Sequence, residues 1–355
     1  MSDELRIGTR GSQLALWQAN AVAERIAAAG GPPCRIIVIS TSGDRLQDAP
    51  LSQVGGKRLF VKEIEDALLR NEIDLAVHSS KDMPAILPDG LVIAGVLPRE
   101  DPRDAVVLPV RLKADTTYET ADAAVSYVVS GFSRTVATID DLVAALGQTP
   151  SIGTGSVRRI AQLTRLFPGA QFKAIRGNLD TRLRKLDEGA HDALVLAAAG
   201  LRRLGFADRI SYALPAAACV PAPGQGIVAV EIRGDDARTR EFVSGLDDPA
   251  AGAALAAERA LVETLGGGCQ TPVGALATLI DDDTIELVAA VIALDGSRAV
   301  RERGVGPRSD AAALGARVGA ALLAQGADQI LADALSENSR QSQVASHKSA
   351  AMTDD

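Results

Sequence analysis

The chain has 355 residues, 47% of them hydrophobic and only 3% aromatic, and a formal net charge of -8. This length exceeds what one hydrophobic core usually supports, so we expect two or three domains with aliphatic cores. The negative charge argues against a nucleic-acid binder that depends on a globally basic face. Three cysteines without metal-ligand spacing predict neither a disulfide framework nor a metal site. No leader-like start and no membrane-length apolar run is present, which predicts a soluble, cytoplasmic protein.

The first hundred residues alternate between strand and helix patterns. Ser12 can cap a helix that runs through Ile26 and stops at Gly30. Apolar residues at helical spacing predict a second helix over 60–69. The expected strands cover residues 5–9, 35–40, 73–78, 91–96 and 105–108. This alternation is typical of helices packed on a largely parallel sheet.

The same pattern restarts at residue 151. We expect strands over 151–154, 171–175 and 193–197, one helix starting at Ser156 and another over 178–187. Residues 7–12 and 152–159 are similar: each joins a strand to a helix through a glycine turn rich in hydroxyl groups. Such turns present N–H groups and a helix N-terminus to an anion. Serine capping alone would explain either turn, but the pair predicts two related α/β domains facing each other across a cleft.

The remaining chain has a different composition. Residues 214–226 are rich in proline and glycine and are predicted to be a crossover linker before a strand over 227–232. A helix over 250–265, strands near 273–279 and 284–292, and a helix over 310–324 predict a small α+β domain. Residues 336–355 are polar and have few large apolar side chains, so we expect a disordered tail.

Cationic residues gather at the edges of apolar segments in this acidic chain. That distribution predicts a local pocket for a small polyanion. One member of each adjacent pair, Arg158 and Arg159 or Arg202 and Arg203, would ordinarily be a solvated surface group. Arg184 and Lys185 are interpreted as surface residues. The clustered cations are Arg10, Lys57, Arg58, Lys81, Arg158, Arg159, Arg176, Arg182, Arg184, Lys185, Arg202 and Arg203.

Cys269 follows three consecutive glycines, where its thiol is sterically open to a bulky group. By composition alone, a flexible turn is the alternative reading of this loop. Cys219 lies in an apolar run and is predicted to fill a core, and Cys34 lies at an expected strand start.

Motifs in a fixed order resemble the porphobilinogen deaminase (hydroxymethylbilane synthase) family over roughly residues 5–334. The segments that carry the resemblance are 6–12, 14–18, 54–57, 59–63, 76–82, 99–105, 153–159, 176–178, 181–183, 200–205, 223–226 and 267–269. Any single motif is weak evidence, but so many in order make coincidence implausible.

The resemblance implies a fold of two periplasmic-binding-protein-like α/β domains facing a cleft, with a small α+β C-terminal domain. Domain 1 would comprise residues 1–104 and 224–246, and domain 2 residues 105–223 with an insertion at about 110–138. Domain 3 would comprise residues 247–335 and carry the cysteine, with the tail over 336–355. We expect a monomer.

The implied activity is that of a transferase in tetrapyrrole (porphyrin, heme) biosynthesis. It joins four porphobilinogen molecules head to tail into linear hydroxymethylbilane and releases ammonia each time. The chain would grow on a covalent dipyrromethane primer, held through a thioether by the residue that matches Cys269. Because every pyrrole carries acetate and propionate groups, guanidinium groups suit their recognition.

The match also assigns roles to individual residues. Gln225 would contact the cofactor or support a hinge, and Lys57 lies in a long loop from Thr41 that is predicted to be a mobile lid. Besides Cys269, the expected cofactor-binding residues are Ser12, Lys81, Asp82, Thr154, Ser156, Arg158, Arg159 and Gln225. The expected substrate-binding residues are Arg10, Ser12, Gln18, Lys57, Arg176, Arg182 and Arg203.

Asp82 is the predicted catalytic residue. In the family, the matching aspartate contacts pyrrole N–H groups, and a carboxylate there stabilises the cation formed when the aminomethyl group departs. From the residues alone, Asp82 reads as a turn residue two positions before Pro84. His78 is predicted to end a strand rather than act as a base.

Three features depart from the family pattern. Gln53 replaces a frequent lysine, Gly155 replaces a frequent serine, and the extra segment at about 110–138 is expected to be a surface loop. Two alternative functions remain: a two-lobed small-anion-binding protein without catalysis, and an inactive homologue with a regulatory role.

Overall fold

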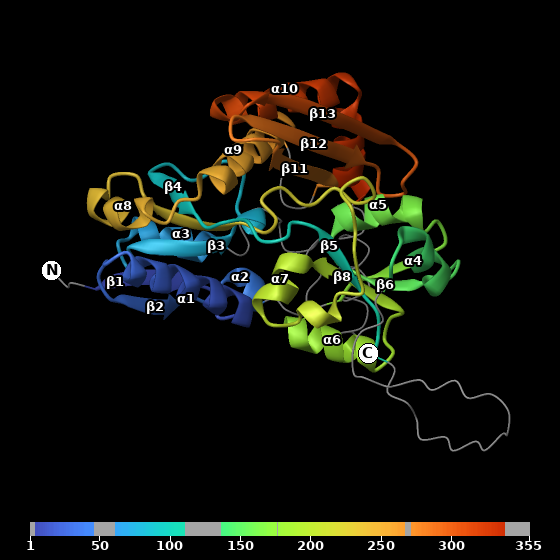
Figure 1. The fold of residues 1–355 in the computed structure, drawn as a ribbon, viewed down its shortest axis with the longest axis horizontal. Coiled ribbons are helices and arrows are strands. Elements are labelled where there is room, and N and C mark those ends of the chain that lie inside the picture. The colour runs from blue at the N-terminus through green and yellow to red at the C-terminus, as the bar shows by residue number, and fades with distance from the viewer. Residues whose placement is uncertain (1–3, 46–60, 111–135, 176, 267–270, 338–355) are drawn as a thin grey trace, which may run out of the picture.

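The computed structural model describes residues 4–45, 61–110, 136–175, 177–266 and 271–337, which form three β-sheets with flanking helices (Figure 1). None of the helices in these ranges is long and apolar enough to cross a membrane. The strands of sheet 1, in spatial order, are β2 (Cys34–Val38), β1 (Leu5–Thr9), β3 (Leu75–Ser79), β10 (Val228–Arg233) and β4 (Leu91–Val96). Those of sheet 2 are β7 (Gln171–Lys173), β6 (Ser151–Gly153), β8 (Ala193–Ala197), β5 (Asp104–Val107) and β9 (Tyr212–Ala213).

The two five-stranded sheets have the same pattern of strand directions. In sheet 1, β1 runs parallel to β2 and β3, and β10 runs antiparallel to β3 and β4. In sheet 2, β6 runs parallel to β7 and β8, and β5 runs antiparallel to β8 and β9. The chain crosses between the sheets twice, from β4 to β5 and from β9 to β10. The internal similarity seen in the two glycine turns therefore extends to whole sheets.

Helices pack on the sheets because their apolar residues recur on one face. In α1 (Gln13–Ala28), Ala15, Ala19, Val22 and Ile26 are buried. The Ser12 side chain accepts a hydrogen bond from the Ala15 N–H and caps this helix. The other helices of this part of the chain are α2 (Ser42–Arg45), α3 (Lys62–Leu69), α4 (Ile139–Leu146), α5 (Val157–Leu166), α6 (Leu179–Asp187), α7 (Ala198–Arg203) and α8 (Ala237–Ser244).

The third unit lies above both sheets in Figure 1. Its antiparallel sheet consists of β11 (Val273–Leu279), β12 (Thr284–Ile292) and β13 (Ala299–Pro307). Helices α9 (Pro249–Thr264) and α10 (Ala311–Ala324) pack on it and on each other. They approach so closely that a Cβ on Gly315 would lie 2.1 Å from the Ala257 carbonyl oxygen. Ala290 and Ile292 of this sheet share a core with Ala161 of α5, which joins the third unit to the second.

The α/β architecture with a small C-terminal unit is the one predicted, and β4, β8, β11 and β12 begin and end as predicted. The prediction omitted α2, α4, α8, β9 and β13. In β13, at the sheet edge, three consecutive charged residues (Arg301, Glu302 and Arg303) are followed by a stretch with two glycines, so no apolar run marks the strand. Residues 327–337 are helical, so the first two residues of the predicted tail belong to a helix. The rest of the tail, most of the loop from Thr41 and residues 111–135 lie outside the described residues.

Candidate active site

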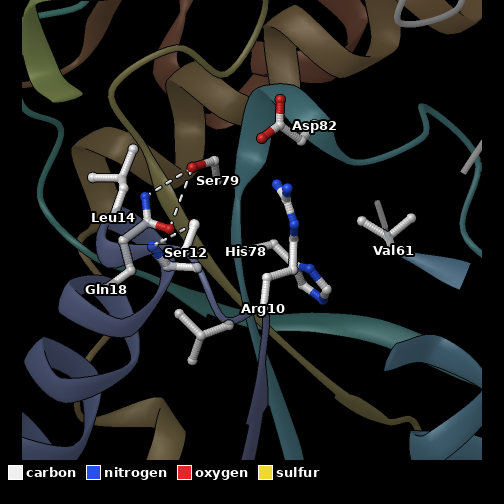
Figure 2. Close-up of a pocket in the computed structure, with 10 residues that line it drawn as sticks. Arg10, Ser12, Leu14, Gln18, Val61, His78, Ser79 and Asp82 are labelled. Atoms are coloured by element: carbon white, nitrogen blue, oxygen red, sulfur yellow. Dashed lines mark hydrogen bonds between the residues drawn. The ribbon is translucent and has the colours of Figure 1, made fainter. Parts of the chain in front are cut away.

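A pocket of about 60 Å³ lies where β1 and β3 end (Figure 2). It brings together four residues that the sequence singled out: Arg10, Ser12, Gln18 and Asp82. Arg10 and Ser12 follow β1, while Asp82 ends the short 3-10 turn that follows β3. The carboxyl ends of parallel strands meet at one sheet edge, and for this reason residues distant in sequence meet here.

Hydrogen bonds fix the wall of this pocket. Gln18 is buried on α1 and its Nε2 donates to Ser79 Oγ over 2.8 Å. Asp82 occupies a turn two residues before Pro84, and it also lines the pocket. The turn alternative and the pocket assignment are thus both compatible with its position.

Lys81 points toward a different group of residues. Its Nζ donates to Gln225 Oε1 over 3.5 Å. Burial lowers the pKa of Lys81 to about 8, and repulsion by Arg159 and Arg158 acts in the same direction, opposed by the Asp82 and Asp104 carboxylates. The lowered pKa therefore reflects chiefly the removal of the Lys81 ammonium group from water.

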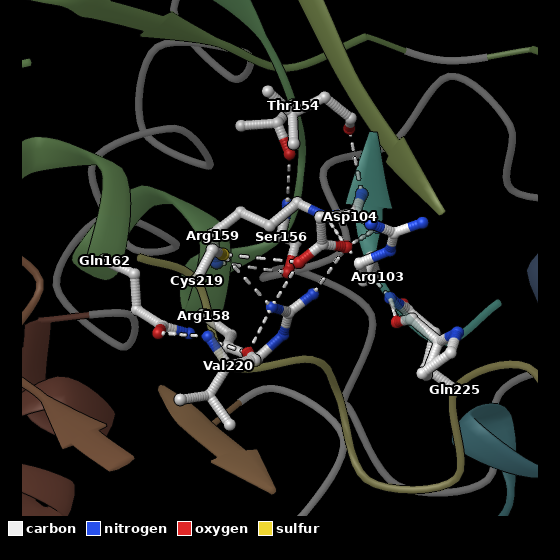
Figure 3. Close-up of polar contacts among 12 residues, drawn as sticks. Arg103, Asp104, Thr154, Ser156, Arg158, Arg159, Gln162, Cys219, Val220 and Gln225 are labelled. Carbon is white, nitrogen blue, oxygen red and sulfur yellow. Dashed lines mark hydrogen bonds and ion pairs between the residues drawn. The ribbon is translucent and has the colours of Figure 1, made fainter. Parts of the chain in front are cut away.

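Arg158 and Arg159, at the start of α5, bind one buried carboxylate (Figure 3). Arg158 Nη1 lies 2.6 Å from Asp104 Oδ2, and Arg159 Nη2 lies 2.8 Å from Asp104 Oδ1. Both arginines are buried, so the expectation that one of them is a solvated surface group is wrong. The reason is Asp104, which opens β5 beneath the N-terminus of α5 and makes burial of both guanidinium groups favourable. In the other pair the expectation is confirmed, because Arg202 is exposed.

The sequence interpretation gave Asp104 no role, although it is the centre of this cluster. Gln225 Nε2 donates to its Oδ1 over 3.0 Å, and the Cys219 thiol donates to its Oδ2 over 3.3 Å. Burial alone would raise the pKa of Asp104, but the two guanidinium groups hold it well below its usual range. The available signal was an acid at the start of the apolar strand Asp104–Val107 in a chain with clustered arginines.

Cys219 is buried as predicted, and burial raises the pKa of its thiol to about 12. It is therefore a packed thiol that donates to a carboxylate, not a reactive one.

The predicted hydroxyl groups lie in the two glycine turns. Ser156 Oγ accepts from the Arg159 N–H over 3.5 Å, and Thr154 Oγ1 accepts from the Ser156 N–H over 3.3 Å. Ser156, like Ser12, is an N-cap, so the capping alternative describes both serines. A hydroxyl that accepts a backbone hydrogen bond retains its own proton, which it can donate to a carboxylate.

Arg182 and Arg203 lie on α6 and α7. Arg182 Nε donates to the Gly177 carbonyl over 2.9 Å, and burial, with the charge of Arg159 nearby, lowers its pKa. Arg203 Nη2 donates to the Gly226 carbonyl over 2.6 Å, and burial lowers its pKa as well. Lys57, Arg176 and Cys269, and the variant position Gln53, lie outside the described residues.

His78 also lines the pocket. It lies on β3, is buried, and its Nε2 is 3.1 Å from Glu231 Oε2 of β10. This placement agrees with the strand position predicted for it.

Lys81, Arg158, Arg159 and Asp104 form a second cluster beside the pocket, and the positive charges in it outnumber the negative ones. Lys81, Arg158 and Arg159 surround Asp104, and a second acid, Asp82, acts on Lys81 from the pocket side. The buried Arg158 Nε has no hydrogen-bond partner in the described part of the chain. With Arg10, Arg182 and Arg203 added, the residues present fit a ligand that carries several carboxylates.

The fold and the site define a two-lobed α/β protein built to bind an anionic ligand, with an added α+β unit. Residues 5–241 match the family model "Porphobilinogen deaminase, dipyromethane cofactor binding domain", and residues 253–324 match "Porphobilinogen deaminase, C-terminal domain". The chain belongs to the porphobilinogen deaminase family.

Curated relatives and a solved structure place this match in context. The porphobilinogen deaminase of Syntrophobacter fumaroxidans is 44% identical over 92% of this chain and 96% of its own length. That of Geobacter metallireducens is 43% identical over 93% of this chain and 94% of its own length. Among solved structures, immunogenic lipoprotein A from Vibrio vulnificus is 12% identical with a TM-score of 0.39, over 70% of this chain and 96% of that one.

Proposed function

We propose that this chain condenses four porphobilinogen molecules head to tail into linear hydroxymethylbilane, releasing one ammonia per addition, on a dipyrromethane held by Cys269. The observation that carries the proposal is the cation-rich cluster around Asp104, in a chain whose first 241 residues match a dipyrromethane-binding family model. A non-catalytic anion binder would not need the acid at the mouth of the Arg10 pocket.

The second cluster would hold the cofactor. Lys81, Arg158 and Arg159, with the hydroxyl groups of Thr154 and Ser156, would bind its acetate and propionate groups. When bound, the dipyrromethane supplies the electron-rich pyrrole carbon on which the chain grows. Gln225 would hold Lys81 close to Asp104, because its side chain contacts both.

The first pocket would hold the incoming porphobilinogen. Arg10, Ser12 and Gln18 would orient its carboxylates and ring, with Arg182, Arg203, Lys57 and Arg176 serving other carboxylates of the growing chain. As the carbon–nitrogen bond of the substrate breaks and ammonia leaves, positive charge develops on the pyrrole. The Asp82 carboxylate would stabilise this charge through the pyrrole N–H. The free α-carbon of the terminal pyrrole then bonds to the methylene carbon of this cation, and the hydrogen on that α-carbon would leave as a proton to the same carboxylate, which restores the aromatic ring.

The two sheets and the third unit support the proposed division into domain 1 (1–104 and 224–246), domain 2 (105–223) and domain 3 (247–335). In this division each chain crossing between sheets 1 and 2 is a hinge segment. We further propose that the protein acts as a cytoplasmic monomer, without nucleic acid or membrane.

Intact-protein mass spectrometry tests the proposal. Protein made with porphobilinogen available should carry the mass of two pyrrole units, located by peptide mapping at Cys269. Cys269→Ser should lack both the added mass and hydroxymethylbilane formation. Cys34→Ser is the matched control, because Cys34 is a free, partly exposed cysteine remote from the site, and it should keep both. An unmodified Cys269 in the wild-type chain would overturn the proposal.

A further inference from the structure

The single tryptophan of this chain lies where the two α/β units meet. Trp17 is on α1, which packs against α7 of the other unit. It remains 39% exposed, so part of its ring is available for a further contact. The Cζ of Arg203 lies over its ring, 5.5 Å from the centroid.

Residues with the same spacing face each other on the two helices. Leu14 and Trp17 are three residues apart on α1, and Gly200 and Arg203 are three residues apart on α7. Leu14 Cδ2 is 3.7 Å from where a Cβ on Gly200 would lie, an ordinary contact distance. Because residues three apart share a helix face, the Leu14–Gly200 contact sets the distance at which Trp17 meets Arg203.

Arg203 has two contacts and retains donors. Its Nη2 donates to the carbonyl of Gly226, at the end of the second crossing segment. Within the described part of the chain no carboxylate forms an ion pair with it: the nearby Glu100 lies 3.9 Å from Arg202 instead. A guanidinium held over an aromatic face by a cation–π contact does not use up its N–H donors in that contact.

We propose that Trp17 is a positioning residue: it holds the Arg203 guanidinium over its ring at the junction of the two units, so that the remaining N–H groups of Arg203 face a substrate carboxylate. This rests on the proposed function, in which Arg203 binds an acetate or propionate of the pyrrole chain. The stacking is made across two units that the chain joins only by two crossing segments. A change in their relative orientation would therefore change the Arg203 position and the environment of Trp17 together.

Steady-state kinetics with porphobilinogen separates positioning from packing. Trp17→Leu removes the aromatic face and should raise KM about three- to tenfold with kcat within twofold. Trp17→Phe keeps a ring and should lie between the wild type and Trp17→Leu. Thermal unfolding of all three should agree within a few degrees, because the position is exposed.

A double-mutant cycle tests whether the effect passes through Arg203. Arg203→Leu should raise KM, and adding Trp17→Leu to it should change KM less than twofold further. An equal effect of Trp17→Leu with and without Arg203 would overturn the inference and leave the proposed function standing. An unchanged KM in Arg203→Leu would overturn both the inference and the substrate role of Arg203, whereas the dipyrromethane mass at Cys269 tests the function independently.

The lone tryptophan gives a second readout. Its emission should shift between the wild type and Arg203→Leu, and again when porphobilinogen binds the wild type. In Arg203→Leu the response to porphobilinogen should be largely lost. A response that is the same in both proteins would contradict the coupling of Trp17 to Arg203.

Discussion

The two glycine turns have similar sequences but different electrostatic surroundings. After β1, Arg10 and Asp82 line one small pocket at the end of the strand. After β6, Arg158 and Arg159 are buried against Asp104, which is itself inaccessible to solvent. The first turn therefore borders a cavity that can admit a ligand, whereas the second is supported by a preformed ion cluster.

This difference indicates a division of labour between the units. A site that holds a permanent group benefits from a rigid scaffold, because pre-organised cations lose little entropy on binding. A site that binds and releases substrates repeatedly needs an accessible charge instead. We therefore expect variants of the second cluster to affect folding first, and variants of the first pocket to affect turnover first.

Asp104→Asn should produce the largest effect on stability. It removes the only carboxylate that pairs with Arg158 and Arg159 among the described residues and leaves two buried cations unpaired. Loss of one partner of a buried ion cluster costs about 3–5 kcal/mol, which urea denaturation would detect. Asp101→Asn is the matched control: its two partners, Arg103 and Arg202, are both largely in contact with solvent, so losing these ion pairs should cost less than about 1 kcal/mol. An equal loss of unfolding free energy in the two variants would contradict the proposal that the Asp104 ion cluster is a rigid scaffold.

Asp82→Asn should produce the largest effect on turnover. A carboxylate that stabilises developing charge is worth about 10²–10³ in rate, so porphobilinogen consumption should fall by that factor. The urea midpoint should change little, because Asp82 is only partly buried. Asp89→Asn, an exposed aspartate seven residues further on, should leave both quantities unchanged. A variant of Asp82 that unfolds without losing specific activity would place it in the scaffold instead.

Lys81 connects the two regions and should give the site a pH dependence. Its pKa is lowered from 10.5 to about 8 in the folded chain, so between these values the unfolded chain holds a proton that the folded chain has lost. Raising the pH through this window therefore increases the stability contributed by Lys81. Binding of anionic ligands should show the opposite trend and weaken above about pH 8, because the ammonium charge is lost.

Lys81→Gln tests both trends. Without a titrating group at this position, the rise in urea midpoint between pH 8 and 10.5 should disappear, and so should the inflection in KM for porphobilinogen near pH 8. If both inflections persist in Lys81→Gln, they belong to another group.

Local patterns made much of the fold predictable. Some features depend only on residues that are neighbours in the sequence, so their positions could be predicted. These are the helix caps Ser12 and Ser156 and the apolar strands over 91–96 and 193–197. The edge strand β13 was missed because its pairing with β12, not its own composition, defines it.

The site was only partly predictable for a related reason. Arg10, Asp82 and Arg158 could be selected because motifs contain them, but the ion cluster depends on which acid is buried beside them. Asp104 lies 54 positions from Arg158 and 121 from Gln225, and only the packed sheets reveal these contacts. The Trp17–Arg203 contact likewise depends on how two helices from different units meet.

Gly155→Ser should produce the smallest effect on stability. It restores to the second turn the hydroxyl group that the family frequently has at this position. A Cβ at position 155 would meet no heavy atom within 4 Å, so the added hydroxyl should change stability by less than about 0.5 kcal/mol. Gly153→Ala, two residues earlier, is the contrasting control, because its Cβ would lie 2.4 Å from Leu194 Cδ2 and 3.1 Å from His191 Cδ2. Overpacking there should cost about 1–3 kcal/mol in urea denaturation. A lower KM for porphobilinogen in Gly155→Ser would show that the added hydroxyl binds a substrate carboxylate. A loss of stability as large as that of Gly153→Ala would show that the turn around position 155 is tightly packed, contrary to the expectation.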